Sequence, residues 1–281
     1  ETYSSPSSDE NPDPAQSINT HVGIKQHSHT LFAQDQIRFI DGRLQLSLSS
    51  RVQNFRLSSP EFSGGTSPYK GIAFETPASA YTGDTSLSYF MVNSGTKLRS
   101  HVGNAYRAPS LFERFGSSFF SGSFSPFGDP RLRPERSVGL DMGVDQFLFD
   151  DRLRLSASYF YTRLQETIFF DFSGVIKPSA DLFGRFGGYR NIGGGIARGL
   201  ETSVSANPVS SLHLTTSYTY TNSDQLISSV VGGDFFRQFG ISDHIFTLTA
   251  LQRIGRRVDV AFDFFASSAY PTPFFSNNGS R

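Results

Sequence analysis

The sequence predicts an all-β protein, an antiparallel transmembrane β-barrel, from three observations. Apolar and polar residues alternate with a period of two in many segments of roughly 9–12 residues, the length that a tilted strand needs to cross a membrane. Segment 211–222 shows the pattern best, because Leu212, Leu214 and Tyr218 share one face while His213 lies on the other. Short turns alternate with long loops, and the polar face carries more charge than a dry core tolerates. Together these features are typical of a membrane barrel with an aqueous interior.

The composition favours strands over helices and excludes several classes of protein. Aromatic residues reach 14%, with 29 Phe, 11 Tyr and no Trp, which suits strands and interfacial girdles. The 25 Lys and Arg residues balance the 25 Asp and Glu residues, so the chain lacks the basic excess of a nucleic-acid-binding domain. No run approaches the roughly 18 apolar residues of a transmembrane helix. Cysteine is absent, so stability must come from the backbone hydrogen-bond ladder rather than from disulfides.

About ten strands are expected, joined into hairpins by short turns. In order, they run over 28–39, from 43 onward, and over 82–91, 97–106, 137–147, 152–163, a segment ending near 206, 211–222, 244–253 and 258–265. The first turn, 40–42, contains an Asp-Gly pair, which favours tight hairpins. The short connections fall at one rim: 40–42, 93–95, 149–151, 207–210 and 254–256. The long loops fall at the other, as in outer-membrane barrels: 57–80, 107–135, 164–187, 223–243 and 269–281.

The two faces of these strands differ in the way that a membrane barrel requires. Mixed charges on the polar face suit a wet lumen or a polar plug: Arg43, Gln45, Arg51, Asp141, Asp145, Arg154, Glu201, His213, Asp259 and Asp263. Aromatic residues near both strand ends predict two girdles, on the loop side and the turn side respectively: Tyr159, Tyr161, Tyr218 and Tyr220, then Phe147 and Phe149. Because every backbone amide must be paired in lipid, such a sheet has to close on itself.

Three segments carry motifs beyond the strand pattern. Residues 102–113 read Val-Gly-Asn-Ala-Tyr-Arg-Ala-Pro-Ser-Leu-Phe-Glu, and residues 128–137 read Gly-Asp-Pro-Arg-Leu-Arg-Pro-Glu-Arg-Ser. Residues 191–201 place Asn-Ile-Gly before Ala-Arg-Gly-Leu-Glu. In this order the three motifs resemble the C-terminal barrel of TonB-dependent outer-membrane receptors. Asp129 stands where that family usually has Asn, a change that keeps the turn chemistry. The resemblance covers roughly residues 28–268.

The resemblance implies a barrel of about 22 strands around an N-terminal plug. Such a receptor sits in the lipid of the bacterial outer membrane and imports a siderophore, haem or cobalamin-type ligand with energy from the TonB complex. The plug, through which TonB acts, is not recognisable in this sequence. The chain starts at Glu1 without an initiator Met, and its last residues are rich in Ser, Asn and Gly. We therefore expect residues 1–281 to be a partial barrel domain, truncated at both ends.

The resemblance and the residue pattern indicate where a ligand would meet the barrel. The loop after residue 107 is crowded with aromatic residues, and we expect ligand contacts from Phe119, Phe120, Phe124, Phe127, Arg114 and Arg131. The alternative is a loop that packs on itself over the barrel mouth. Three charged residues of the polar face are expected to face the lumen or plug: Arg107, Glu135 and Glu201. The alternative for these residues is a set of structural ion pairs between neighbouring strands, involving Arg133 or Arg198.

The sequence offers no catalytic or metal-binding constellation. His27 and His29 share a strand face, but two solvated histidines are the more ordinary explanation of this spacing. The glycines at 193–195 are not followed by a helix, so they predict a joint between loop and strand rather than a phosphate loop. We expect no cofactor, no metal and no enzymatic activity. The alternatives are a passive porin-like or adhesive barrel, an outer-membrane enzyme, or a soluble lectin-like β domain.

Overall fold

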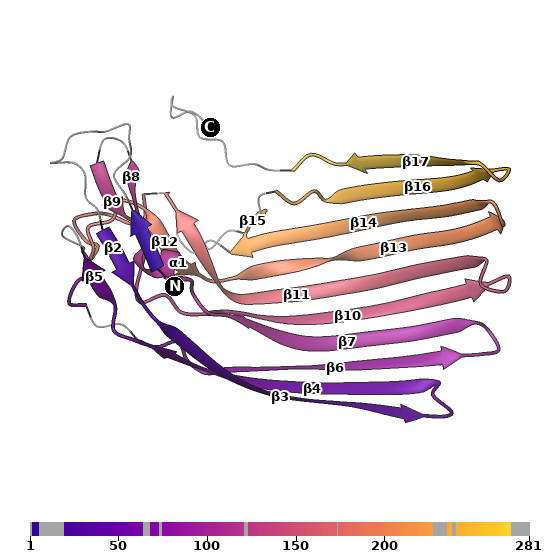
Figure 1. The fold of residues 1–281 in the computed structure, drawn as a ribbon, viewed down its shortest axis with the longest axis horizontal. Coiled ribbons are helices and arrows are strands. Elements are labelled where there is room, and N and C mark those ends of the chain that lie inside the picture. The colour runs from indigo at the N-terminus through magenta and orange to yellow at the C-terminus, as the bar shows by residue number, and fades with distance from the viewer. Residues whose placement is uncertain are drawn as a thin grey trace.

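The computed structural model describes residues 2–5, 20–63, 68–72, 75–120, 123–172, 174–226, 235–237 and 240–270. Its main element is a 12-stranded antiparallel sheet (Figure 1). The long strands are hydrogen-bonded in the order β17-β16-β14-β13-β11-β10-β7-β6-β4-β3. Their bounds are β3 (Gln26–Phe39), β4 (Leu44–Leu57), β6 (Ala80–Met91), β7 (Thr96–Arg107), β10 (Glu135–Leu148), β11 (Leu153–Asp171), β13 (Gly195–Val209), β14 (Leu212–Leu226), β16 (His244–Ile254) and β17 (Val258–Ser267). The predicted all-β class is confirmed.

Tight turns join neighbouring strands at one end of the sheet. In the first turn Ile40, Asp41 and Gly42 have φ angles of 53°, 52° and 81°. The N–H of Gly42 donates to the carbonyl of Phe39 at 3.1 Å. Asp tolerates this left-handed conformation and Gly adopts it freely, which explains why the Asp-Gly pair makes the turn here. All five short turns lie at the right-hand end of the sheet in Figure 1, so the predicted one-sided arrangement is confirmed.

The long connections fold into a layer of short elements at the other end. The connection after β7 contains α1 (Leu111–Phe115), β8 (Ser117–Phe120) and β9 (Ser123–Pro126). β12 (Gly188–Ile192) extends the sheet beside β11, and β15 (Phe235–Arg237) does so beside β14. β1 (Thr2–Ser5), β2 (Thr20–Gly23) and β5 (Glu61–Ser63) form a separate three-stranded sheet. Among the described residues, no helix is long and apolar enough to span a membrane.

Two strand ends differ from the sequence prediction. β11 continues to Asp171, where a loop was expected from residue 164, because its last residues pair with β12. β13 continues to Val209 through the Asn-Pro pair that was expected to begin a turn. A register shift between Ala206 and Val209 accommodates the proline, which has no N–H to donate. The predicted joint at 193–195 is confirmed, since Gly194 has a φ of 82° between β12 and β13.

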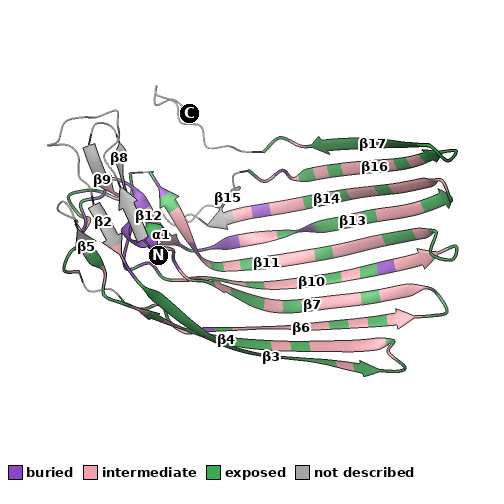
Figure 2. Cartoon of the chain, viewed as in Figure 1, coloured by how far each residue is buried: buried purple, intermediate pink, exposed green. Residues whose placement is uncertain are grey.

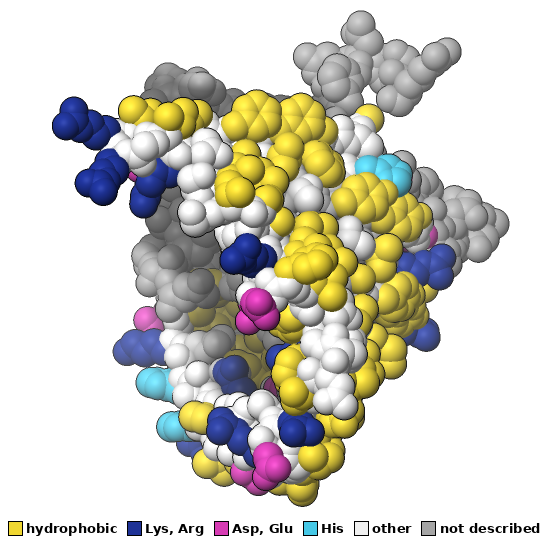
Figure 3. Space-filling view, turned by 90° about the vertical axis from the view of Figure 1, so that its right-hand side faces the viewer, with side chains coloured by type: hydrophobic (Ala, Val, Ile, Leu, Met, Phe, Trp, Pro, Cys, Tyr) yellow, Lys and Arg dark blue, Asp and Glu magenta, His cyan; other side chains and the backbone are white. Residues whose placement is uncertain are grey.

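The cross-strand register separates the side chains into two faces. On the outward face, Val102 lies opposite Leu140, which in turn lies opposite Tyr161. Apolar side chains on this face remain exposed, for example Met142 at 53% and Leu200 at 41%. Figure 2 accordingly shows few buried positions along the strands. Figure 3 shows hydrophobic side chains gathered on one side of the curved sheet and a hollow on the other.

The tyrosines expected in the loop-side girdle lie on the outward face in consecutive register pairs: Tyr159 with Leu200, Leu200 with Tyr220, and Thr202 with Tyr218. Phe147, however, is wrongly assigned to the girdle. It lies opposite Arg154 on the polar face, and its ring centroid is 6.2 Å from that of Phe90. Side chains alternate strictly between the two faces of a strand. Phe147 is an even number of residues from Asp141 and Asp145 in β10, so it shares the polar face with them.

Candidate functional site

Two groups of charged residues line the hollow side of the sheet, which we call the lumen face. In the first, His101 lies between two acids, with Nδ1 3.2 Å from Asp141 and Nε2 4.0 Å from Asp84. The hydroxyl of Ser49 donates to Asp84. These residues come from β4, β6, β7 and β10, so the contacts run straight across neighbouring strands.

The second group is centred on Asp145, whose side chain is only 3% exposed. Arg99 and Arg154 each lie 3.4 Å from its carboxylate, and the hydroxyl of Ser156 donates to it at 2.6 Å. Two guanidinium groups and a hydroxyl thus satisfy one buried carboxylate, as a charge removed from water requires. The polar face therefore combines charges of both signs in a hydrogen-bonded wall.

At the loop end of this wall, Arg107 joins β7, β10 and α1. Its guanidinium donates to Glu135 and forms two hydrogen bonds, of 2.9 and 3.0 Å, to Glu113. Glu113 also closes a capping box with Ser110, which begins α1. Burial alone would raise the pKa of Glu113, but the hydrogen bonds from Arg107 and Ser110 outweigh it and hold that pKa below its usual value.

The expected lumen residues therefore differ in their surroundings. Arg107 and Glu135 form the structural ion pair that was the alternative explanation for them. Glu201 lies on the lumen face opposite Ser158 and Thr219. Within the described part of the chain no arginine pairs with Glu201, and Arg198 lies on the opposite face. Arg133 pairs with Glu166 instead.

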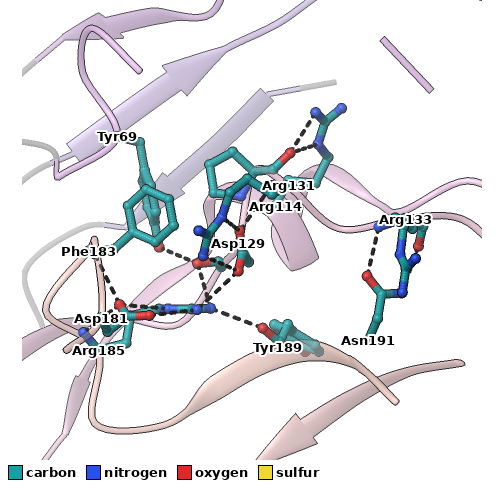
Figure 4. Close-up of polar contacts among 12 residues, drawn as sticks. Tyr69, Arg114, Asp129, Arg131, Arg133, Asp181, Phe183, Arg185, Tyr189 and Asn191 are labelled. Carbon is teal, nitrogen blue, oxygen red and sulfur yellow. Dashed lines mark hydrogen bonds and ion pairs between the residues drawn. The ribbon is translucent and has the colours of Figure 1, made fainter. Parts of the chain in front are cut away.

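A buried ionic core holds the loops above the wall (Figure 4). Arg185 is its centre, with a side chain 3% exposed. It donates to Asp181 at 2.9 Å, to Asp129 at 3.1 Å and to the carbonyl oxygens of Gly128 and Tyr189 at 3.1 and 2.9 Å. Burial opposes ionisation of Asp181, but its hydrogen bonds with Arg185 prevail and lower its pKa. We call Asp129, Asp181 and Arg185 the loop clamp.

An apolar cluster packs against the loop clamp, since the guanidinium of Arg185 lies 5.4 Å from the ring centroid of Phe183. It comprises Ile24, Tyr69, Leu111, Phe115 and Phe183. Tyr69 connects the two, since its hydroxyl donates to the carbonyl oxygen of Gly128 at 3.0 Å. Burial raises the pKa of this phenol well above its usual value, so the hydroxyl stays a donor. Three loops that are far apart in sequence therefore form one packed unit.

The candidate ligand-binding residues are distributed within this unit. Arg114 is 4% exposed and donates to the carbonyl oxygens of Pro130 and Glu75 at 2.9 and 2.8 Å. Phe127 is also buried, among the rings of Phe170, Phe172 and Phe186. Arg131 is the exposed cation, with 56% of its side chain accessible and two hydrogen bonds of 3.0 Å to Asp129.

The remaining candidates lie on the hairpin of β8 and β9. The backbones of Phe119 and Phe124 are opposite each other in that hairpin, and Phe120 is opposite Ser123. The side chains of Phe119, Phe120 and Phe124 lie outside the described part of the structure. The expectation that they contact a ligand therefore stays a prediction.

A cavity of about 880 Å³ opens beside the loop clamp. It lies between the segments 75–78, 130–136 and 165–166, and its lining includes the side chains of Arg131, Arg133 and Arg136. No group of three or more His, Asp or Glu residues able to hold a metal ion is found among the described residues. The site is therefore a set of folded loops above a polar wall, with arginines at its margin.

The sequence analysis did not find the loop clamp. Asp181 and Arg185 are four residues apart in a segment assigned to an unstructured loop, and they meet Asp129 only through the fold. The available signal was weak: the second motif includes Asp129, but nothing in its spacing indicates a partner more than 50 residues later.

Comparison with known proteins agrees with this architecture. The chain matches the family model described as TonB dependent receptor-like, beta-barrel, over residues 2–277. No curated protein matches it in sequence. The siderophore receptor PirA from Pseudomonas aeruginosa has a similar structure, with a TM-score of 0.62 at 13% identity over 95% of this chain and 47% of PirA. The siderophore receptor PiuA from Acinetobacter baumannii gives 0.62 at 15% identity over 89% of this chain and 34% of PiuA.

The copper transporter OprC is also similar, with a TM-score of 0.59 at 16% identity over 85% of this chain and 35% of OprC. At such identities the likeness establishes the fold alone, and the chain spans less than half the length of each of these three proteins. The apolar outward face and the one-sided loops agree with an outer-membrane location, which is that of the family and of these structural neighbours. The chain belongs to the TonB-dependent receptors, a family of outer-membrane transport receptors, and corresponds to their β-barrel.

Proposed function

We propose that this chain serves an outer-membrane receptor that takes up a scarce ligand, such as a ferric siderophore, haem or a cobalamin-type compound, with energy supplied through TonB. The observation that supports this proposal is the loop clamp: Arg185 pairs with Asp181 of its own loop and with Asp129 of another, and Tyr69 joins a third loop to them through the carbonyl oxygen of Gly128, so the loops form one packed unit at the end opposite the short turns. Preorganised loops reduce the entropy lost on binding, which a receptor needs in order to capture a dilute ligand. The chain carries out transport and makes or breaks no bonds.

We also propose that the strands form part of a larger barrel of about 22 strands that encloses a plug. Two features support this. β3 and β17 end the strand path and are exposed along nearly their whole length, and an unpaired edge is unfavourable in lipid. The lumen wall also carries charges of both signs, including Glu201 without an arginine partner among the described residues, which suits contact with a polar plug.

For the ligand, we propose contacts in the loop 108–134. Phe119, Phe120 and Phe124 supply the aromatic surface and Arg131 the exposed cation. Arg114 and Phe127 contribute indirectly: both are buried, and they fix the shape of the loop that presents the other residues to the ligand. An anionic or aromatic ligand fits this combination, since the exposed guanidinium of Arg131 can stack on rings and keeps N–H groups beyond the two that donate to Asp129.

Uptake measurements on the full-length receptor test the function. A strain that lacks other receptors would be supplied with labelled ferric siderophores, haem and cobalamin, with and without TonB. We expect saturable uptake of one ligand class that disappears without TonB. Uptake that is unsaturable, unselective and independent of TonB would contradict the proposal and favour the porin-like alternative.

Substitutions in the loop test the contacts. We expect Arg131→Gln, and the pair Phe119→Ala with Phe120→Ala, each to weaken ligand binding about tenfold. Arg256→Gln, in a short turn at the opposite rim, is the matched control and should leave binding unchanged. Wild-type binding and uptake in both loop variants would contradict the assignment of these contacts.

A further inference from the structure

The outward face of the sheet carries its charges near the loop end. Along the register rows of the ten long strands, the outward residues with fixed charge among those described are Asp35, Arg56, Arg136, Arg163, Glu166, Arg198 and Asp224. Asp35 lies within the edge strand β3. Arg56, Arg136, Arg198 and Asp224 lie near the loop-side ends of their strands, and Arg163 and Glu166 lie in β11 at the level where β10 and β13 begin. This position corresponds to the headgroup level of a membrane, just beyond the tyrosines of the girdle.

Three of these arginines form a continuous diagonal across β10, β11 and β13. Arg163 lies opposite Val138 on one side and Ile196 on the other. Arg136 is two residues from Val138 and Arg198 is two residues from Ile196, so both are diagonal neighbours of Arg163. Diagonal neighbours on adjacent strands are about 7–8 Å apart, within reach of long side chains. We call Arg136, Arg163 and Arg198 the arginine row.

The arginine row has no acidic partner within the described part of the chain. None of its members forms an ion pair there, although Asp224 lies two residues beyond the partner of Arg198 and Glu166 lies opposite Arg136. Glu166 pairs with Arg133 instead. All three arginines are exposed. Arg136 lies over the ring of Tyr106, 6.0 Å from its centroid, which leaves its charge unneutralised.

The arginine row also continues into the cavity of about 880 Å³ described above. Arg136 belongs to both, and Arg131 and Arg133 add two further guanidinium groups to the cavity, whose lining also includes Glu75 and the Glu166 that pairs with Arg133. Pro77, Ala78, Leu132 and Pro134 supply apolar lining beside them. The arginines at the headgroup level therefore lie next to a partly apolar cavity. The strand surface between them and the middle of the membrane is apolar and rich in tyrosine.

We propose that the arginine row binds the phosphate groups of a phosphorylated glycolipid in the outer leaflet. Guanidinium groups bind phosphate bidentately and are more weakly hydrated than ammonium groups. The row faces away from the lumen, so a soluble ligand passing through the barrel does not meet it. The exposed apolar face below, with Met142 and Leu200, accommodates the acyl chains. This inference concerns the lipid-facing surface and holds whatever ligand the receptor transports.

Lipid binding to the purified full-length receptor tests the proposal, with diphosphoryl lipid A as the probe. The variant R136Q/R163Q/R198Q removes the row. Its control, R38Q/R51Q/K97Q, removes the same charge from the lumen face. Each cation near a membrane surface contributes about a fivefold gain in affinity, so we expect about a 100-fold loss in the first variant and none in the control. We expect the same lipid without phosphates to bind weakly to all three proteins.

Each single substitution in the row should weaken binding about fivefold, which keeps the test available if the triple variant fails to insert. Wild-type affinity in all variants of the row would overturn the proposal, as would equal losses in the lumen-face control. Equal binding of the phosphate-free lipid would also overturn it. Displacement of the lipid by inorganic phosphate at a similar concentration would assign the site to free phosphate and contradict the lipid.

Discussion

In the sheet, the large apolar side chains are exposed on the outward face, whereas the buried hydrophobic cluster lies among the loops, at Ile24, Tyr69, Leu111, Phe115 and Phe183. The sheet is held by repeated backbone hydrogen bonds between neighbouring strands, so each side chain contributes little to its stability. The loops have few such hydrogen bonds, and their stability depends on particular side chains, above all Arg185 with its two acids. A single substitution should therefore affect the loops most when it removes a contact, and the sheet most when it places a charge against lipid.

The largest expected effect comes from Arg185→Met. The substitution leaves the buried carboxylate of Asp181 without its cation and removes the buried one of the two arginines that pair with Asp129, which costs about 3–5 kcal/mol. Hydrogen exchange on the full-length receptor in detergent should show lost protection in segments 127–131 and 181–189. Protection of the strands should remain.

Arg131→Met is the matched control for this substitution. It removes an arginine from the same Asp129, but Arg131 is 56% exposed, so its loss should cost less than about 1 kcal/mol. Equal losses in the two variants would show that burial of Arg185 does not set the stability of the loops.

The next effect tests the outward face. Met142→Arg places a cation at the middle of β10 on that face and should destabilise the folded receptor in lipid vesicles by about 2–4 kcal/mol. Ser203→Arg, on the lumen face of β13, should change stability little. Urea unfolding from vesicles measures both. A lumen variant that is destabilised more than the outward variant would reverse the assignment of the faces.

A smaller effect is expected from Ser110→Ala, which removes the capping box of α1. The backbone N–H of Glu113 then loses its acceptor, at a cost of about 1 kcal/mol. Limited proteolysis of the loop 108–134 should become faster, while Ser110→Thr, which keeps the hydroxyl, should behave like the wild type. Unchanged proteolysis in Ser110→Ala would contradict a stabilising role for the cap.

The smallest effect concerns pH. The folded pKa of Asp181 lies below its unfolded value of about 3.9, so its contribution to stability is present above that value and is lost as pH falls through the folded pKa. Protection of segment 181–185, corrected for intrinsic exchange, should therefore be constant between about pH 5 and pH 8 and fall only below about pH 4. A loss near neutral pH would point to another group.

The difference between the regular sheet and the irregular loops explains which parts of the fold could be predicted from the sequence. Period-two alternation predicts a strand such as β14 because each residue is confined to one of two faces. Turn chemistry likewise predicts the Asp41-Gly42 hairpin. Phe147 was assigned to the girdle because it is aromatic, although its alternation with its neighbours in β10 places it on the polar face. The end of β11 was missed because its last residues form a strand only by pairing with β12.

The candidate site was less accessible to sequence reasoning. The ion pair of Arg107 with Glu135 could be predicted as an alternative, because both residues end neighbouring strands. The loop clamp could not, since Asp129 and Arg185 meet across loops without any periodicity. Burial of Arg114 and Phe127 has the same origin, so exposure of a loop residue cannot be inferred from its place in a loop.

We propose that all the long loops face the outside of the cell and all the short turns face the periplasm. The 281 residues contain no cysteine, so single cysteines can be introduced at Lys177 in a long loop and at Arg256 in a short turn of the full-length receptor. In intact cells a membrane-impermeant maleimide should label K177C, and it should label R256C only after the outer membrane is permeabilised. Labelling of R256C in intact cells, with K177C protected, would show the opposite orientation of loops and turns.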